Sequence, residues 1–142
     1  MTDKRCAFCD EGLRPDTVEH FRPKHAGAFP ELAFAWDNLF PCCCECNQAK
    51  GKRFEEGLLN PDAEDYAFNR YFLCNYETGE IEISSRADLE DQVRAEITCR
   101  LYGLNSPDRT EARKQELRKW IICRDNGDFT LDDFNYRFFL EP

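Results

Sequence analysis

Alternating apolar and polar residues predict two short strands in the first third of the chain. Residues 18–21 have this pattern, and residues 34–40 form a second candidate strand. The connection between them is rich in proline and glycine, which predicts a loop. Residues 44–54 predict a short helix, although Gly51 weakens its far end because glycine disfavours helix. The first third therefore predicts a ββα arrangement.

A second pair of strands is expected farther along the chain. Residues 70–76 and 80–83 have the composition of strands and flank the turn sequence Glu-Thr-Gly at residues 77–79. A short connection containing glycine between two such runs is typical of a β-hairpin.

A helix is predicted after this hairpin by apolar residues four positions apart. Ser85 is expected to cap it, with Asp88 in its first turn, and Gly103 is expected to end it. The residues expected on its apolar face are Leu89, Val93, Ile97 and Leu101.

Another helix is expected to begin at Ser106, with Pro107 at its first position, and to end at Gly127. The residues expected to share one face are Leu117, Trp120, Ile121 and Arg124. Basic residues of this helix alternate with acidic ones, which favours a solvated face over a nucleic-acid stripe; they are Arg109, Arg113, Lys114, Arg118 and Lys119. Thr130 with Asp133 predicts a last short helix, with a strand as the alternative.

Two Cys-x-x-C pairs connect distant parts of the first 60 residues. Cys6 and Cys9 form one pair, Cys43 and Cys46 form the other, and 33 residues separate them. This spacing is typical of a structural zinc site with four thiolate ligands. Cys42 and Cys44 are expected to be bystanders. A structural metal would stabilise a unit too small to fold on an apolar core alone.

Polar groups suited to hydrolysis lie beside these cysteine pairs. His20 has a side chain that can act as a general base near neutral pH. Glu19 and Asn47 offer oxygen ligands of the kind that Mg²⁺ and Mn²⁺ prefer. Trp36 is expected to be a core anchor, and His25 to lie at the surface. We therefore expect two metal sites, a closed zinc site and an open catalytic site.

Composition places the chain among globular proteins of one domain. Of its 142 residues, 42% are hydrophobic and 33% are charged. We expect a single domain over residues 1–142, with the zinc-bearing core in residues 1–60 and a hairpin and helical extension in residues 61–142. Nine cysteines, the absence of an apolar run long enough to span a bilayer and a polar start predict a cytoplasmic protein with reduced thiols.

The net charge of −9 argues against strong nucleic-acid binding by the chain alone. The first 60 residues carry 8 Lys and Arg against 10 Asp and Glu, so most of the acidity lies in the rest of the chain. Basic residues that surround the candidate site are either solvated charges or phosphate contacts; they are Arg22, Lys24, Lys50, Lys52 and Arg53. We infer that a partner protein supplies part of the affinity for nucleic acid.

The motifs C-x-x-C, E-H-F-R-P-K, W-x-N-L and C-x-x-C-N-x-x-K together resemble those of HNH endonucleases of the zinc-bearing ββα-metal class. Within that class the chain is similar to PtuB-like nucleases of Septu and retron-associated antiphage defence systems. The match covers about residues 6–53, with a weaker match to about residue 120. It implies an α+β fold: a zinc-stapled ββα-metal (HNH) core followed by a β-hairpin and two or three helices.

The resemblance also implies roles for individual residues. His20 would be the general base, and Glu19 and Asn47 the ligands of the catalytic ion. Asn38 matches the central asparagine that holds the loop bearing the base, and Lys50 matches the lysine that follows the last metal ligand.

A function in defence follows from the same resemblance: cleavage of DNA using Mg²⁺ or Mn²⁺, with an ATPase partner that recruits the substrate. Two alternatives stay open from the sequence. One is an HNH nuclease that cleaves RNA, such as tRNA, and the other is a zinc-binding interaction module without catalysis.

Overall fold

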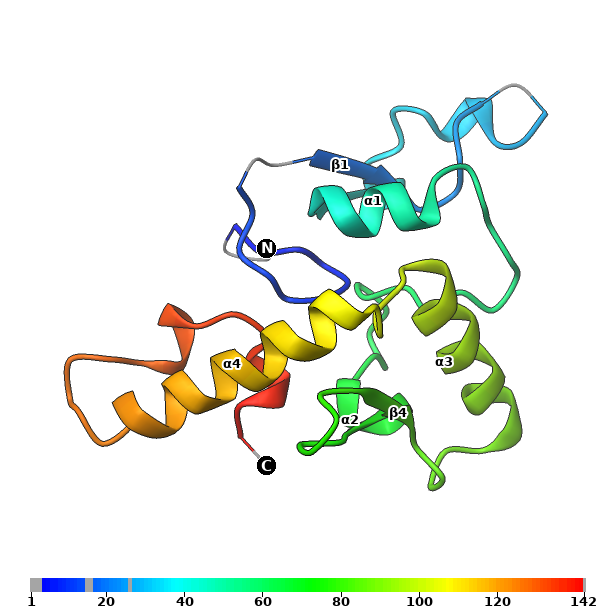
Figure 1. Cartoon of the computed structure of the whole chain (residues 1–142). Helices are drawn as coiled ribbons and strands as arrows, with labels where there is room; N and C mark the ends of the chain where they lie inside the picture. Colours follow the sequence, from blue (N-terminus) through cyan, green and yellow to red (C-terminus); the bar gives the residue numbers. More distant parts are fainter. Residues whose placement is uncertain (1–3, 15–16, 26, 142) are drawn as a thin grey trace.

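The computed structural model describes residues 4–14, 17–25 and 27–141, in which helices are mixed with short strands. A ββα unit lies at one end of the molecule, and the hairpin and the two longer helices lie at the other (Figure 1). The described strands form two sheets of two strands each. The α+β fold expected from the sequence is confirmed. No helix within the described ranges combines the length and apolarity needed to cross a bilayer.

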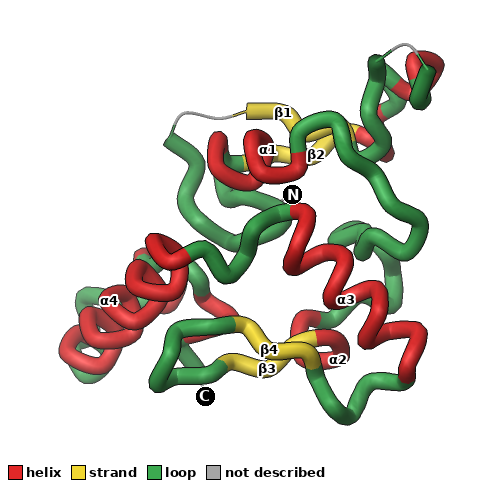
Figure 2. The backbone as a smooth tube through the Cα atoms, turned by 45° about the vertical axis from the view of Figure 1, so that its right-hand side comes forward, coloured by secondary structure: helices red, strands yellow, loops and turns green. Residues whose placement is uncertain are grey.

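The ββα unit consists of β1 (Thr17–His20), β2 (Leu39–Cys42) and α1 (Cys44–Lys50). The two strands pair antiparallel, with His20 opposite Leu39, and α1 packs beside them (Figure 2). α1 ends earlier than expected because Gly51 adopts a positive φ of 55°, which glycine tolerates and which stops the helix.

The segment between the two strands differs from the expected strand at residues 34–40. It contains two 3₁₀ turns, η1 (Pro30–Leu32) and η2 (Trp36–Asn38), and it projects from the end of the ββα unit (Figure 1). Trp36 is 85% exposed, so the expectation that it anchors the core is wrong. Its ring stays in solvent because η2 turns the chain back toward β2 at this point.

The hairpin expected from the sequence is confirmed, with shorter strands. β3 (Phe72–Cys74) pairs antiparallel with β4 (Ile81–Ile83), and the amide of Asn75 donates to Glu80 O at 2.9 Å inside the turn. The start of the expected first strand is instead the single-turn helix α2 (Phe68–Tyr71).

Helix α3 (Leu89–Leu101) begins at a different cap from the one predicted. The Asp88 carboxylate accepts from the amide of Asp91 at 2.8 Å, so Asp88 rather than Ser85 is the N-cap. The expected apolar face is correct only for its second half: Leu101 is buried and Ile97 packs against the core, but Leu89 is 81% exposed and Val93 is 55% exposed. The residues of α3 that are buried are Asp91, Ala95, Thr98 and Leu101.

Helix α4 (Pro107–Cys123) starts as expected, with Ser106 as N-cap and Pro107 in its first turn. It ends at Arg124 rather than at Gly127. Its inner face is charged, and the buried residues are Arg109, Arg113 and Glu116. The expectation of a solvated basic face is therefore wrong for Arg109 and Arg113, while Arg118 and Lys119 are exposed as expected.

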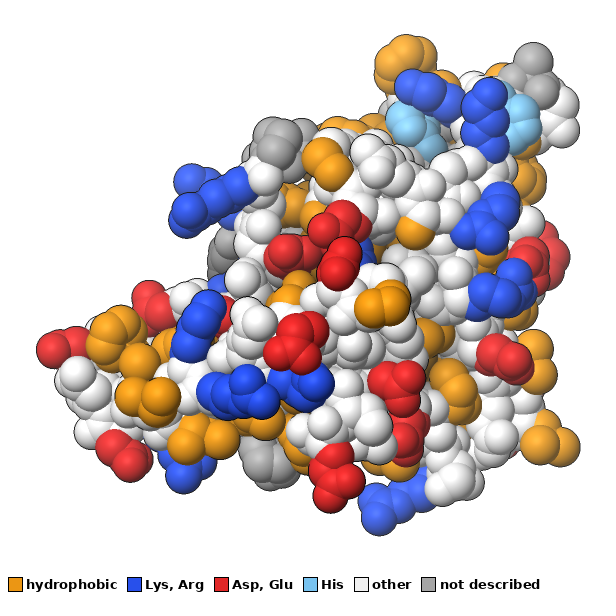
Figure 3. Space-filling view, in the orientation of Figure 1, with side chains coloured by type: hydrophobic (Ala, Val, Ile, Leu, Met, Phe, Trp, Pro, Cys, Tyr) orange, Lys and Arg blue, Asp and Glu red, His pale blue; other side chains and the backbone are white. Residues whose placement is uncertain are grey.

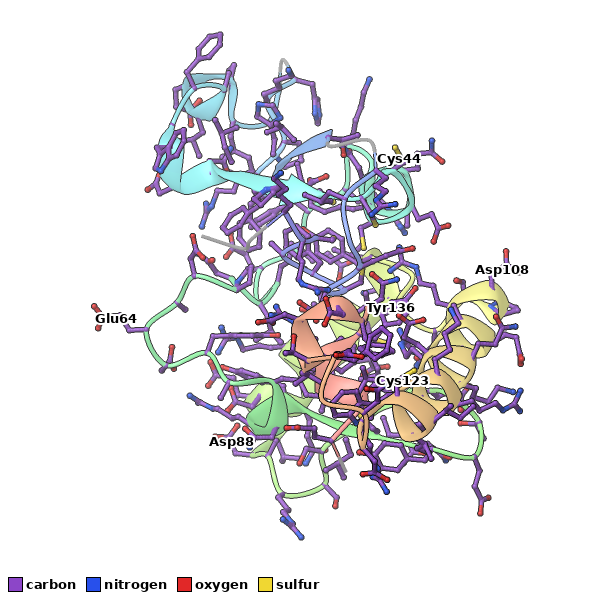
Figure 4. The ribbon with its side chains drawn as sticks, turned by 90° about the vertical axis from the view of Figure 1, so that its left-hand side faces the viewer. Cys44, Glu64, Asp88, Asp108, Cys123 and Tyr136 are labelled. Atoms are coloured by element: carbon purple, nitrogen blue, oxygen red, sulfur yellow. The ribbon has the colours of Figure 1, made fainter. Side chains whose placement is uncertain are left out.

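Arg113 shows how a charged side chain is accommodated there. Its guanidinium donates to Gly79 O at 2.8 Å and to Leu104 O, and it lies 5.7 Å from the ring centroid of Tyr136. Figure 4 shows Tyr136 on the C-terminal segment beside this helix.

The end of the chain returns to the N-terminal cysteine loop. Thr130 and Asp133 form a capping box, but the turns that follow, η3 (Leu131–Asp133) and η4 (Arg137–Phe139), are 3₁₀ rather than α-helical. Arg137 pairs with Asp10 at 2.7 Å, which ties the C-terminal segment to the N-terminal cysteine loop.

One hydrophobic cluster joins the first 60 residues to the rest. The rings of Phe8 and Tyr102 stack with centroids 3.9 Å apart, and Phe40, Leu59 and Leu101 are buried in the same cluster. Because the ββα unit shares this core with the helical extension, its site rests on both parts of the chain.

Candidate metal centres and active site

Four cysteines meet where the N-terminal loop approaches α1. The sulfurs of Cys6, Cys9, Cys43 and Cys46 all lie within 4.8 Å of one another, and all four side chains are buried. A tetrahedral zinc with Zn–S bonds of about 2.3 Å holds its sulfurs about 3.8 Å apart. The Sγ atoms of Cys9 and Cys43 are 3.7 Å apart, so the cluster fits a structural zinc ion. These are the four cysteines that the sequence spacing indicated.

The neighbouring cysteines Cys42 and Cys44 are not among these four. Cys42 is fully buried, and its thiol is directed to Cys43 O at 3.4 Å. Cys44 is half-buried on the first turn of α1 (Figure 4).

Arg109 of α4 covers the thiolates. Its Nη1 donates to Cys46 Sγ at 3.1 Å and its Nη2 to Cys43 Sγ at 3.5 Å, while Nε pairs with Glu45 Oε2 at 3.2 Å. Burial lowers the pKa of Arg109, but the charges of the nearby thiolates outweigh this effect and raise that pKa above its ordinary value. A four-thiolate zinc site has excess negative charge, which this cation offsets. Sequence reasoning missed Arg109, because it lies 63 positions after Cys46 in the chain.

A cavity of about 380 Å³ lies on the other side of the ββα unit. It is lined by His20 and Glu19 at the end of β1, by Asn47 of α1, and by His25 from the loop. The structure thus brings together the three residues expected to form the catalytic site. Figure 3 shows both histidines in pale blue at the top of the molecule, with Lys and Arg side chains beside them.

The ring of His20 is held by the loop that follows it. Its Nε2 lies 3.0 Å from the carbonyl oxygen of Ala33. Because a carbonyl oxygen only accepts hydrogen bonds, this contact requires the proton on Nε2. The lone pair of the neutral ring then lies on Nδ1, which is the nitrogen left to accept a proton.

Glu19 faces the inside of the unit, where Lys50 meets it. Lys50 Nζ lies 2.5 Å from Glu19 Oε1 and donates to His20 O at 3.0 Å. The two side chains are 0% and 2% exposed. Burial raises the pKa of Glu19, and the Lys50 ammonium opposes that rise. Lys50, which the sequence suggested as a phosphate contact, is therefore occupied inside the fold.

Asn47 presents its amide to β1. Its Nδ2 donates to Thr17 Oγ1 at 3.1 Å and to Val18 O at 3.3 Å. Within the described part of the chain, no hydrogen bond engages the side-chain oxygen of Asn47, so this oxygen is available as a ligand. Its neighbour Cys46 belongs to the cysteine cluster, which fixes the first turn of α1.

Asn38 secures the loop behind His20. Its Oδ1 accepts from the amide of Arg22 at 2.7 Å, and its Nδ2 donates to Arg22 O at 2.9 Å and to Leu32 O at 3.1 Å. Asn38 is buried and does not line the cavity, so its contacts hold the backbone on both sides of the loop.

Of the remaining basic residues, two lysines face the cavity and two arginines make contacts within the fold. Lys24 and Lys52 are exposed and line the cavity. The Arg22 guanidinium stacks over Phe29 and Phe54, with its central carbon 5.2 and 5.1 Å from the two ring centroids. Arg53 donates to Lys50 O and Leu101 O, each at 3.3 Å, and so joins the end of α1 to the end of α3.

Comparison with known proteins agrees with this geometry. Residues 4–53 match the family model described as HNH endonuclease. Septu protein PtuB from Bacillus thuringiensis is 35% identical over 82 residues, an alignment that covers 54% of this chain and 31% of that relative. The alignment thus spans about a third of the length of this curated relative. No solved structure matched. Residues 4–53, which hold the ββα core and its cysteine cluster, are thus similar to HNH endonucleases.

Proposed function

We propose that this chain is a metal-dependent endonuclease that hydrolyses phosphodiester bonds in DNA. The observation that carries this proposal is the cavity on which His20, Glu19 and Asn47 meet. Its volume of about 380 Å³ is large enough for a phosphate group with a water molecule and a hydrated cation. The match of residues 4–53 to the HNH endonuclease family model supports a nucleic-acid substrate.

His20 acts as the general base in this proposal. It takes a proton from the attacking water at Nδ1, because Nε2–H is committed to Ala33 O. The same hydrogen bond orients the ring and stabilises the positive charge that the ring gains on protonation. Asn38 stabilises the position of the His20 ring indirectly, because its three hydrogen bonds fix the loop to which Ala33 belongs.

Glu19 and Asn47 are the proposed ligands of Mg²⁺ or Mn²⁺. A carboxylate oxygen and an amide oxygen are hard donors that suit these ions, and two protein ligands leave positions for water and phosphate. Such an ion, when bound, neutralises charge on the phosphate and on the leaving oxygen. Burial raises the pKa of Glu19, and Lys50 opposes this rise and favours the ionised carboxylate, because its ammonium lies against Oε1.

The four thiolates are the proposed ligands of a structural zinc ion, closed to substrate. They hold the N-terminal loop against the start of α1 and so fix Asn47, the residue after Cys46. Lys24 and Lys52 are the cavity-lining cations suited to contact phosphates.

The likeness to Septu protein PtuB supports a role in antiphage defence. The proposal adds a cytoplasmic location and an ATPase partner that recruits the substrate. The net charge of −9 is consistent with a need for such a partner, because an acidic chain repels the nucleic-acid backbone.

Cleavage of DNA and of RNA should be compared with Mg²⁺ or Mn²⁺, with the ATPase partner present. His20→Ala is expected to lower the rate about 10²- to 10⁴-fold, as for the loss of a general base. His25→Ala is the matched control, because it removes the other histidine of the same cavity; it is expected to lose far less.

Each alternative has its own outcome in this assay. Cleavage of RNA but not DNA by the parent would replace the DNA substrate with RNA. A folded, zinc-loaded His20→Ala variant that cleaves as fast as the parent would instead favour an interaction module without catalysis in this cavity.

A further inference from the structure

Two large aromatic rings project from the loop between β1 and β2. Phe34 is 95% exposed and Trp36 is 85% exposed. The other rings of this region pack in pairs, such as Phe29 with Phe54 at a centroid distance of 5.5 Å. Leaving two neighbouring rings in water forgoes the burial that stabilises a fold, so such a pair indicates a binding surface.

The loop that carries both rings is fixed by hydrogen bonds. The amide of Ala35 donates to Leu32 O at 3.2 Å, and the amide of Asn38 donates to Ala35 O at 3.0 Å. The side chain of Asn38 also donates to Leu32 O at 3.1 Å. Rings held on such a turn lose little freedom when a ligand binds, which favours binding.

The same loop is joined to the proposed catalytic base. Ala33, whose carbonyl oxygen holds His20 Nε2 at 3.0 Å, directly precedes Phe34. Phe34 is therefore one residue, and Trp36 three residues, from the backbone contact that holds the ring of His20. Figure 3 shows hydrophobic side chains at this end of the molecule next to the two histidines and to basic side chains.

Charge favours a nucleic acid on this side of the molecule. Lys24 and Lys52 line the cavity and are exposed, while the acidic residues of the loop are Glu31 and Asp37. Residues 21–38 carry Arg22 and Lys24 against Glu31 and Asp37, so this loop has no net formal charge. Its negative charges lie in the segment that carries the two rings, and Lys24 lies at the cavity, which suits contact with phosphates.

We propose that Phe34 and Trp36 form a stacking platform for unpaired bases next to the scissile phosphate. This inference rests on the function proposed above and narrows its substrate to nucleic acid that is single-stranded or splayed open at the cleavage position. Aromatic side chains bind bases of any sequence by stacking on their faces, and these faces are hidden inside an intact duplex.

Intrinsic fluorescence can test this platform directly. The chain has two tryptophans, so Trp120→Phe leaves Trp36 as the reporter, and His20→Ala in the same chain prevents cleavage. Short oligo(dT), oligo(rU) and a blunt DNA duplex of equal length are titrated into this protein. Both single strands are expected to quench Trp36 and to bind more tightly than the duplex.

Variants then measure the contribution of each ring to binding. In the same background, Phe34→Ala is expected to weaken single-strand binding about 5- to 100-fold, and Trp36→Ala, followed by anisotropy of a labelled oligonucleotide, is expected to do the same. Phe129→Ala is the matched control, because Phe129 is a partly exposed ring outside this loop. The affinity of this variant for the single-stranded oligonucleotide should equal that of the parent.

Several results would overturn the platform. These are no quenching by any single strand, equal affinity for strand and duplex, or unchanged affinity in both alanine variants. Loss of association with the ATPase subunit in these variants, with oligonucleotide binding intact, would make the rings a protein docking site instead. Failure of the catalytic proposal can be distinguished from failure of the platform. The first would appear as normal cleavage by His20→Ala, whereas the second would appear only in the binding titrations.

Discussion

The ion pair of Glu19 and Lys50 is the residue-level feature on which the proposed catalytic site most depends. Both side chains are buried, with Nζ 2.5 Å from Oε1. Removing one partner of a buried pair leaves the other charge without compensation, which costs about 3–5 kcal/mol. We expect Lys50→Met to lower the free energy of unfolding by this amount, measured by urea denaturation of the zinc-loaded chain.

Lys52→Met is the matched control, because Lys52 is an exposed lysine two residues away. It should change the free energy of unfolding by no more than about 0.5 kcal/mol. The double variant Glu19→Gln/Lys50→Met removes both charges and should recover part of the loss. Equal stabilities of Lys50→Met and Lys52→Met would show that the pair does not form.

Asn38 affects the proposed reaction through the backbone rather than through the substrate. Asn38→Ala removes three hydrogen bonds from Arg22 and Leu32. We expect a loss of about 2–4 kcal/mol in the free energy of unfolding. We also expect cleavage to be about 10²-fold slower, because the loop that positions the ring of His20 is released. Binding of Mn²⁺, measured by calorimetry, should change much less than the rate, and an equally large loss of Mn²⁺ affinity would contradict a purely positioning role.

The sequence allowed some residues of the site to be predicted but not the contacts that hold them. The spacing of Cys6, Cys9, Cys43 and Cys46 indicated the cysteine cluster, because two Cys-x-x-C pairs in one chain are typical of a bound metal ion. Lys50 looked like a surface cation, since nothing local shows that a lysine will meet a glutamate 31 residues earlier in the chain. The hydrogen-bond acceptor of His20 could not be predicted either, because it is the backbone carbonyl oxygen of Ala33, which any residue at that position would provide.

At the scale of elements, α4 docks through charged side chains, which reverses the usual pattern of an amphipathic helix. Arg109 contacts the thiolates and Arg113 contacts backbone carbonyls, so these two arginines lie inside while Ile122 lies outside at 78% exposure. Helical periodicity alone assigned the opposite faces. The hydrophobic pattern could not reveal which face is buried. The two arginines are buried because thiolates and backbone carbonyls of other elements accept their hydrogen bonds, and these acceptors are not visible in the sequence of the helix.

Arg109 therefore couples α4 to the proposed zinc site. We expect Arg109→Met to weaken zinc binding about 10- to 100-fold, as is typical when a partner of the ligands is lost. The measurement is the transfer of zinc to a chromogenic chelator. Arg118→Met, an exposed arginine on the same helix, is the control and should release zinc like the parent. Equal zinc affinity in all three proteins would mean that the guanidinium contributes packing only.

Helix α3 illustrates a second limit of periodicity. Residues spaced by four drift around a helix that has 3.6 residues per turn, so Leu89 and Leu101 cannot lie on one narrow face. The buried stripe instead runs through Ala95 and Thr98, and the Thr98 hydroxyl accepts from the amide of Leu59 at 3.0 Å. The element was predicted correctly, while its orientation depended on small and polar residues that carry a weak hydrophobic signal.

At the scale of the whole molecule, the cysteine cluster links segments from both ends of the chain. The N-terminal loop contributes Cys6 and Cys9, α4 contributes Arg109, and the C-terminal segment is tied to the same loop by Arg137 and Asp10. Loss of zinc would leave four buried thiols beside a buried arginine, with the charge balance of the cluster gone. Zinc removal should therefore release the ββα unit and the start of α4 together.

Cys9→Ser tests this linkage without a chelator. We expect it to lower the thermal midpoint strongly and to make that midpoint independent of added zinc, because structural zinc supplies on the order of 10 kcal/mol in small zinc-bound units. Cys123→Ser, at the end of α4 and outside the cluster, should shift the midpoint by only a few degrees. Hydrogen exchange of the Cys9→Ser variant should show β1, β2 and the first turns of α4 losing protection at one rate. If α4 stayed protected while the strands exchanged freely, Arg109 would not transmit the loss of zinc to the helical extension.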